Sequence, residues 1–149
     1  MLDIKYVREN QEAVAEAMKN RNASWDAERF SSLDENRRAA AEAEALRKGD
    51  FPAFLALVNA SGASSWQYLQ NVTSGDPRQQ ALAVTLAVCR RALGGQGAVR
   101  VHGGGFGGTA QAFVPLDMLD GFRDRVEASL GRGCCHVVRI RPAGGIRLG

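Results

Sequence analysis

The chain has 149 residues, of which 45% are apolar and 23% are charged, and its net charge is +3; this composition is typical of a globular domain with a real core. No apolar run approaches the roughly 20 residues that span a bilayer, and the first residues lack a signal-peptide pattern, so we expect a cytoplasmic protein with no membrane partner. Three cysteines and two histidines without paired spacing argue against a disulfide framework and against a zinc site.

The charge and the glycines are unevenly distributed along the chain. Residues 1–50 hold nine Lys and Arg against eleven Asp and Glu, a net charge of −2, whereas the remaining residues hold ten Arg against five acidic residues. None of the 17 glycines precedes Gly49. Two segments of different origin would give this distribution, and so would one protein with a helical extension.

The first part of the chain is expected to be helical. Apolar residues recur at three- and four-residue steps over residues 1–21, with a joint at Asn10. A second helical run begins at Asp26 and continues to Leu46, and it consists mostly of Ala, Glu and Arg. Because this run has few large apolar side chains, we expect a solvated arm or one half of an incomplete helical hairpin, continuous over residues 39–47.

Two further helices are predicted after this arm. Gly49 is suited to end one helix and Asp50 to cap the next, which should run through Asn59 and be followed by a small-residue loop over residues 61–65. Asp76 is the expected N-cap, and Pro77 the first residue, of a buried helix that ends at Gly94-Gly95.

The C-terminal part combines strands with a helix. Apolar alternation over residues 98–102 and 109–114 predicts two strands, residues 115–130 a helix, and the sequence CCHVVRIR at residues 134–141 a third, half-exposed strand. The fold class is therefore α+β: N-terminal helices are followed by a helical layer packed on a small antiparallel β-β-α-β sheet. An unpaired edge of such a sheet would favour self-association.

A glycine run separates the first two strands and is the main candidate site. It consists of Gly103, Gly104, Gly105, Phe106, Gly107 and Gly108. A dinucleotide fingerprint needs a helix after the run, whereas a strand is predicted here, and a P-loop needs a lysine, which is absent beyond Lys48. A turn without any ligand is the alternative.

The remaining candidates for chemistry are weak. Serines at residues 61–65 with His102 or His136 lack a nucleophile elbow. The arginines at residues 100, 139, 141 and 147 could form a basic sheet face for phosphate or RNA, but they lack the interleaved aromatics of an RNA-binding sheet. Of Cys134 and Cys135, one should face the core and the other solvent. No catalytic residue and no metal ligand is predicted.

Three N-terminal segments resemble the N-terminus of bacterial-type seryl-tRNA synthetases. Their sequences are MLDIKYVREN, EAVAEAMKNR and LDENRRAAAEAEAL. The resemblance covers residues 1–46 and implies the start of a helical arm that contacts transfer RNA in that family. The rest of the arm and the catalytic domain have no counterpart here, so a truncated arm is expected.

Three segments resemble the C-terminal part of galactokinases, which are GHMP kinases. Their sequences are GDFPAFLALVNASGASSWQYLQNV, RVHGGGFGGTAQAFVPLDML and HVVRIRPAGG. This resemblance covers residues 46–147 and implies that the run from Gly103 to Gly108 lies near the phosphates of ATP and its Mg²⁺. The family's catalytic aspartate and main nucleotide loop have no counterpart, so phosphoryl transfer is not expected from this chain alone.

The two resemblances predict a fusion of two domains, residues 1–46 and residues 47–149. The first hypothesis for function is an incomplete galactokinase-like domain that is inactive without a separate kinase half. The alternative is an interaction module that binds transfer RNA weakly through the N-terminal arm, and a third possibility is a folded fragment without activity.

Overall fold

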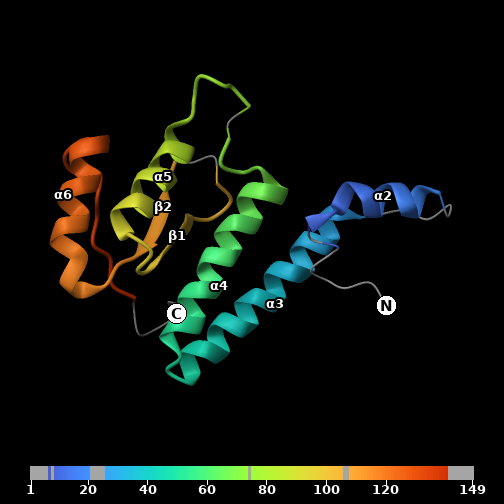
Figure 1. The fold of residues 1–149 in the computed structure, drawn as a ribbon, viewed down its shortest axis with the longest axis horizontal. Helices are drawn as coiled ribbons and strands as arrows, with labels where there is room; N and C mark the ends of the chain where they lie inside the picture. The colour runs from blue at the N-terminus through green and yellow to red at the C-terminus, as the bar shows by residue number, and fades with distance from the viewer. Residues whose placement is uncertain (1–6, 8, 21–25, 74, 106–107, 141–149) are drawn as a thin grey trace, which may run out of the picture. The chain divides into compact units, whose positions relative to one another are not determined.

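The computed structural model describes residues 7, 9–20, 26–73, 75–105 and 108–140. Over these residues the chain is a mostly helical α+β protein, with five α-helices and a two-stranded antiparallel sheet (Figure 1). It forms two compact units, Met1–Gln70 and Asn71–Gly149, which are described separately below. None of the helices in the described ranges is both long enough and apolar enough to cross a membrane.

The first unit contains α2 (Gln11–Lys19), α3 (Ala27–Arg47) and α4 (Phe51–Ser64). Helices α3 and α4 lie side by side as an antiparallel hairpin (Figure 1). The predicted continuous helix over residues 39–47 is confirmed, since these residues lie within α3.

The connection between α3 and α4 is a three-residue turn, Lys48-Gly49-Asp50. The backbone N–H of Asp50 donates to the carbonyl of Ala45 at 2.9 Å and that of Gly49 to Leu46 at 3.1 Å, which is the Schellman pattern. Gly49 adopts φ +70, a conformation that side-chain-bearing residues rarely take. The Asp50 carboxylate then accepts the N–H of Ala53 at 3.0 Å and caps α4. The predicted roles of Gly49 and Asp50 are confirmed.

Helix α4 is longer than predicted. The expected loop at residues 61–65 is wrong, because α4 continues to Ser64 and then tightens into a π-helical turn, η1 (Ser65–Leu69). Ser61, Ser64 and Ser65 are at most 8% exposed. Small side chains allow a neighbouring helix to approach closely, so packing against α3 overrides the low helix propensity of serine and glycine.

The second unit packs helices against the short sheet. It contains α5 (Ala81–Leu93), β1 (Ala98–Val101), β2 (Ala110–Phe113), the 3₁₀ turn η2 (Leu116–Met118) and α6 (Leu119–Leu130). Strands β1 and β2 pair antiparallel, with Ala98 opposite Phe113 and Val101 opposite Ala110. Helix α5 packs against both β1 and α6. The core residues of this unit that are least exposed are Leu86, Ala98, Val99 and Val101.

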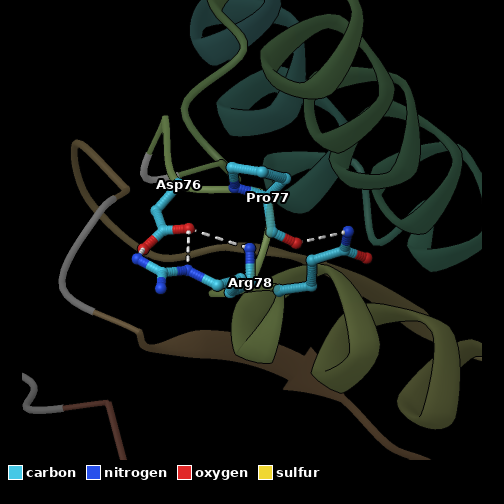
Figure 2. A network of polar contacts seen from close by, with 4 residues as sticks. Asp76, Pro77 and Arg78 are labelled. Carbon is cyan, nitrogen blue, oxygen red and sulfur yellow. Dashed lines mark hydrogen bonds and ion pairs between the residues drawn. The ribbon is translucent and has the colours of Figure 1, made fainter.

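The start of α5 differs from the prediction. Asp76 does not cap a helix; it organises a turn in which the N–H of Gln79 donates to its carbonyl at 2.9 Å. Its carboxylate accepts the backbone N–H of Arg78 at 3.0 Å and the Arg78 guanidinium at 3.0 and 2.9 Å (Figure 2). The Arg78 side chain, more than its backbone N–H, holds the pKa of Asp76 below its ordinary value. The bidentate pairing stabilises this turn, and α5 starts only at Ala81.

The third predicted strand is also wrong over the residues that the structure describes. Residues 134–140 have no regular secondary structure, and Arg141 lies outside the described residues. Val137, Val138 and Ile140 are 63%, 80% and 90% exposed. An alternating segment becomes a strand only when a neighbouring edge supplies hydrogen bonds, and in the described part of the chain β1 and β2 pair only with each other. The sheet is therefore β-β followed by α6, and not β-β-α-β.

Candidate nucleic-acid interface

Exposed cations and an exposed aromatic ring gather at the turn between α3 and α4. We call this group, Leu46, Arg47, Lys48 and Phe51, the hairpin tip. The side chains of Arg47 and Lys48 are 69% and 68% exposed, and Phe51 is 61% exposed although it begins an apolar helix. The tight turn explains this exposure, because it places the first residue of α4 beyond the end of the packed helix pair. Phe51 keeps one edge-to-face contact with Phe54, whose ring centre is 6.4 Å away.

Glu44 partly neutralises the cations of the hairpin tip. Its carboxylate accepts a hydrogen bond from Nη1 of Arg47, and its Oε1 lies 3.4 Å from Nζ of Lys48. All three side chains are about half exposed or more, so these ion pairs are weak and are screened by salt. A phosphate group could therefore displace Glu44 from either cation at low cost.

A buried polar network lies between α3 and α4. Arg38 donates from Nη1 to Oδ2 of Asp34, one helical turn earlier, and from Nη2 to the hydroxyl of Ser64 at 2.9 Å. The three residues are 5%, 5% and 8% exposed. Nε of Arg38 is buried and finds no acceptor among the described residues. Buried charges are tolerated only when they are paired, so this network must form whenever the two helices pack.

Sequence reasoning missed both of these features. It expected residues 26–46 to be a solvated arm or one half of an incomplete helical hairpin, and it singled out no residue of the turn as exposed and no residue of α3 as buried. The available signal was the spacing of Asp34, Arg38 and Ala45, which share one face of α3 and are all buried. An acidic and a basic residue four positions apart are usually read as a surface pair, so the spacing alone did not reveal the burial.

The glycine run lies in the second unit and connects β1 to β2, as predicted for a turn. The N–H of His102 donates to the carbonyl of Thr109 at 2.9 Å and extends the ladder beyond the strands. Gly105 packs so closely that a Cβ atom would lie 2.1 Å from the carbonyl oxygen of Asn71. Phe106 and Gly107 lie outside the described residues. The observed role of this loop is close backbone packing.

One of the serines considered for chemistry has a structural role. Ser64 accepts a hydrogen bond from Arg38 and thereby links α4 to α3. Within the described residues, no group of three or more His, Cys, Asp and Glu side chains is arranged to hold a metal ion.

Residues 1–49 match the family model described as the seryl-tRNA synthetase N-terminal domain. The matched segment is about a third of the chain and ends at the hairpin turn, on the glycine that lets α3 pass into α4. No curated protein and no solved structure matches the chain.

The resemblance to galactokinases is wrong. The family match covers residues 1–49 and concerns a different family, and residues 46–147 show no match to a GHMP kinase. Short glycine-rich and apolar segments recur in unrelated α+β proteins, which explains why these segments suggested the wrong family. The predicted position of Gly103, Gly104, Gly105, Phe106, Gly107 and Gly108 near a nucleotide, with ATP and Mg²⁺ as ligands, rested on that resemblance and has no further support. The division at residues 46 and 47 stays a prediction about the origin of the two segments.

Proposed function

We propose that the first unit is an RNA-binding helical hairpin whose ligand is transfer RNA. The observation that carries the proposal is the match of residues 1–49 to the seryl-tRNA synthetase N-terminal domain, which ends where α3 turns into α4. The resemblance implies only the start of such an arm, and α4, which follows the matched segment, packs antiparallel on α3 and completes a helical hairpin.

The hairpin tip supplies the two kinds of contact that RNA binding needs. Arg47 and Lys48 extend into solvent and can reach phosphate oxygens, and the exposed ring of Phe51 can stack on an unpaired base. Transfer RNA presents both a continuous backbone and unpaired loop bases. Helix α4 carries no charged residue, so the contribution of the hairpin to phosphate binding must come from α3 and the turn.

The electrostatics limit how strong this binding can be. Residues 1–50 have a net charge of −2, and both cations of the tip share Glu44 as a partner. Few phosphates can therefore be neutralised, and the affinity should be modest and should fall as salt rises from about 50 mM to about 200 mM.

The proposal is tested by measuring the fluorescence anisotropy of labelled transfer RNA with the full chain at several salt concentrations. The double variant Arg47→Ala/Lys48→Ala should weaken binding and reduce the salt slope by about two, since each lost phosphate contact lowers it by about one. The matched control is Arg90→Ala/Arg91→Ala, which removes two adjacent exposed arginines from the last turn of α5 and leaves the hairpin intact. Equal losses in both variants would show that only the overall charge matters, and the proposal would then fail.

A further inference from the structure

Cys134 and Cys135 direct their sulfur atoms toward each other. The two Sγ atoms are 4.0 Å apart, although adjacent side chains of an extended strand point to opposite faces. The segment follows the turn at residues 131–134, where the N–H of Cys134 approaches the carbonyl of Gly131 at 3.4 Å. Cys134 is exposed and Cys135 is half-buried, so a small ligand in solvent can reach the pair.

The sulfur separation suits a single bridging atom. A disulfide would bring the sulfurs to about 2.05 Å, so both cysteines are thiols here. Two sulfurs that bind one tetrahedral zinc ion at about 2.3 Å each lie about 3.8 Å apart, and a three-coordinate arsenic atom, whose bond angles are smaller, holds its two sulfurs closer together. The observed 4.0 Å is slightly longer than either spacing, so a small movement of the side chains places one soft atom between the two sulfurs.

The surroundings decide which soft atom fits. A structural zinc ion needs four protein ligands, and the described part of the chain offers no group of three His, Cys, Asp and Glu residues arranged for a metal ion. Cys89 is the third cysteine of this unit, but it is only 5% exposed in the core on α5. An organic trivalent arsenical needs just two protein sulfurs, because its carbon substituent occupies the third bond.

The protonation of the pair favours the same ligand. Burial, followed by the neighbouring Cys134, raises the pKa of Cys135 to about 11, so this thiol is protonated at neutral pH. A metal ion binds thiolate and must displace that proton. An arsenical carries hydroxyl groups that leave as water together with the thiol protons. Its binding therefore releases no free proton, in contrast to the binding of a metal ion.

We propose that Cys134 and Cys135 form a vicinal dithiol site that binds a monosubstituted trivalent arsenical through both sulfurs. In the binding step, R–As(OH)₂ and two S–H groups give R–As(S)₂ and two molecules of water. Two As–O and two S–H bonds break, two As–S bonds and two O–H bonds form, and arsenic remains trivalent. The site lies in the second unit and does not depend on the RNA-binding proposal.

The test uses phenylarsine oxide, which hydrates to the required dihydroxy form, and the reduced full chain. Intact mass spectrometry should show one phenylarsenic group bound per chain, and an excess of a small dithiol should remove it. Cys134→Ser and Cys135→Ser should each lose the adduct, whereas Cys89→Ala should keep it. Peptide mapping after alkylation of the unfolded adduct should find Cys89 alkylated and the other two cysteines protected.

Three results would overturn the site. The wild-type chain could fail to take up phenylarsenic, either serine variant could retain the adduct, or mapping could show that Cys89 is protected in place of one of the pair. The mapping uses the wild-type chain, so it decides the assignment even if Cys89→Ala does not fold.

Discussion

Arg38 on α3 donates a hydrogen bond from Nη2 to the hydroxyl of Ser64 on α4, 26 residues further along the chain, at 2.9 Å. The same guanidinium pairs with Asp34, and all three residues are at least nine-tenths buried. In most helix pairs these positions would hold apolar side chains. The contact between α3 and α4 therefore depends on a charged network whose members need one another.

Replacing Arg38 with Met should destabilise the first unit strongly. The Asp34 carboxylate would stay buried and would lose the Arg38 guanidinium, while the largely exposed Arg37 stays 3.6 Å away. Removing one partner of a buried ion pair leaves the other charge uncompensated and lowers the free energy of unfolding by about 3 to 5 kcal/mol. Urea denaturation followed by tryptophan fluorescence measures this unit, because both tryptophans lie in residues 1–70.

The double variant Asp34→Leu/Arg38→Met is the control for that experiment. It replaces both charges with apolar groups, which is often neutral in buried sites, so most of the lost stability should return. A single Arg38→Met variant that loses less than about 1 kcal/mol would contradict the role given to the network.

Gly105→Ala should destabilise the second unit. The new Cβ would meet the Asn71 carbonyl oxygen at 2.1 Å, and the backbone at Gly105 has φ +80. The strain should cost about 2 kcal/mol or more, which corresponds to about 30-fold faster hydrogen exchange in β1 if the unit opens as a whole. Gly104→Ala is the matched control, because its Cβ would meet nothing within 4 Å. Equal exchange rates in the two variants would contradict the close packing of this loop.

The carboxylate of Glu127 should make the end of α6 sensitive to acid. The backbone N–H of Gly133, more than the nearby Arg123, lowers the pKa of Glu127 from its ordinary value of 4.5. A lowered pKa in the folded state means that the ionised form favours folding, so this contribution is present above pH 4.5 and is lost as the pH falls through the folded pKa. The protection factor of the Gly133 amide, which is the unfolded-chain exchange rate divided by the observed rate at the same pH, should fall over that range in the wild type and should be low at every pH in Glu127→Gln. A protection factor that does not change with pH in the wild type would refute the link.

Glu44→Gln should strengthen binding of transfer RNA. The substitution removes the carboxylate that pairs with Arg47 and Lys48, and it keeps the size of the side chain. Exposed pairs are worth up to about 1 kcal/mol, so the affinity measured by anisotropy at low salt should rise about two- to fivefold. Glu12→Gln on α2 changes an exposed carboxylate away from the tip and should have a smaller effect. A similar gain in both variants would show that only net charge matters.

The parts of the fold that sequence predicted correctly are those governed by local rules. Gly49 and Asp50 form the expected turn and cap, because the conformation at glycine and the reach of an aspartate side chain depend on few neighbours. Gly94 and Gly131 end α5 and α6 for the same reason.

The wrong predictions concern residues whose state depends on distant partners. Ser61 and Ser64 are helical because α3 packs on them, and residues 134–140 are not a strand because no described edge pairs with them. Asp76 pairs with Arg78 and forms a turn where a helix cap was expected. The candidate interface could be anticipated in part: the N-terminal resemblance drew attention to residues 1–46, but the exposure of Phe51 follows from the tertiary turn.

Contact between the hairpin tip and transfer RNA is tested most directly by titrating unlabelled transfer RNA into the ¹⁵N-labelled full chain and following the backbone amides by NMR. The amides of residues 44–51 should shift or broaden first, and added salt should reverse the change. Shifts confined to the second unit, or unchanged amides at residues 44–51 when the RNA is bound, would contradict the proposal that the hairpin tip contacts transfer RNA.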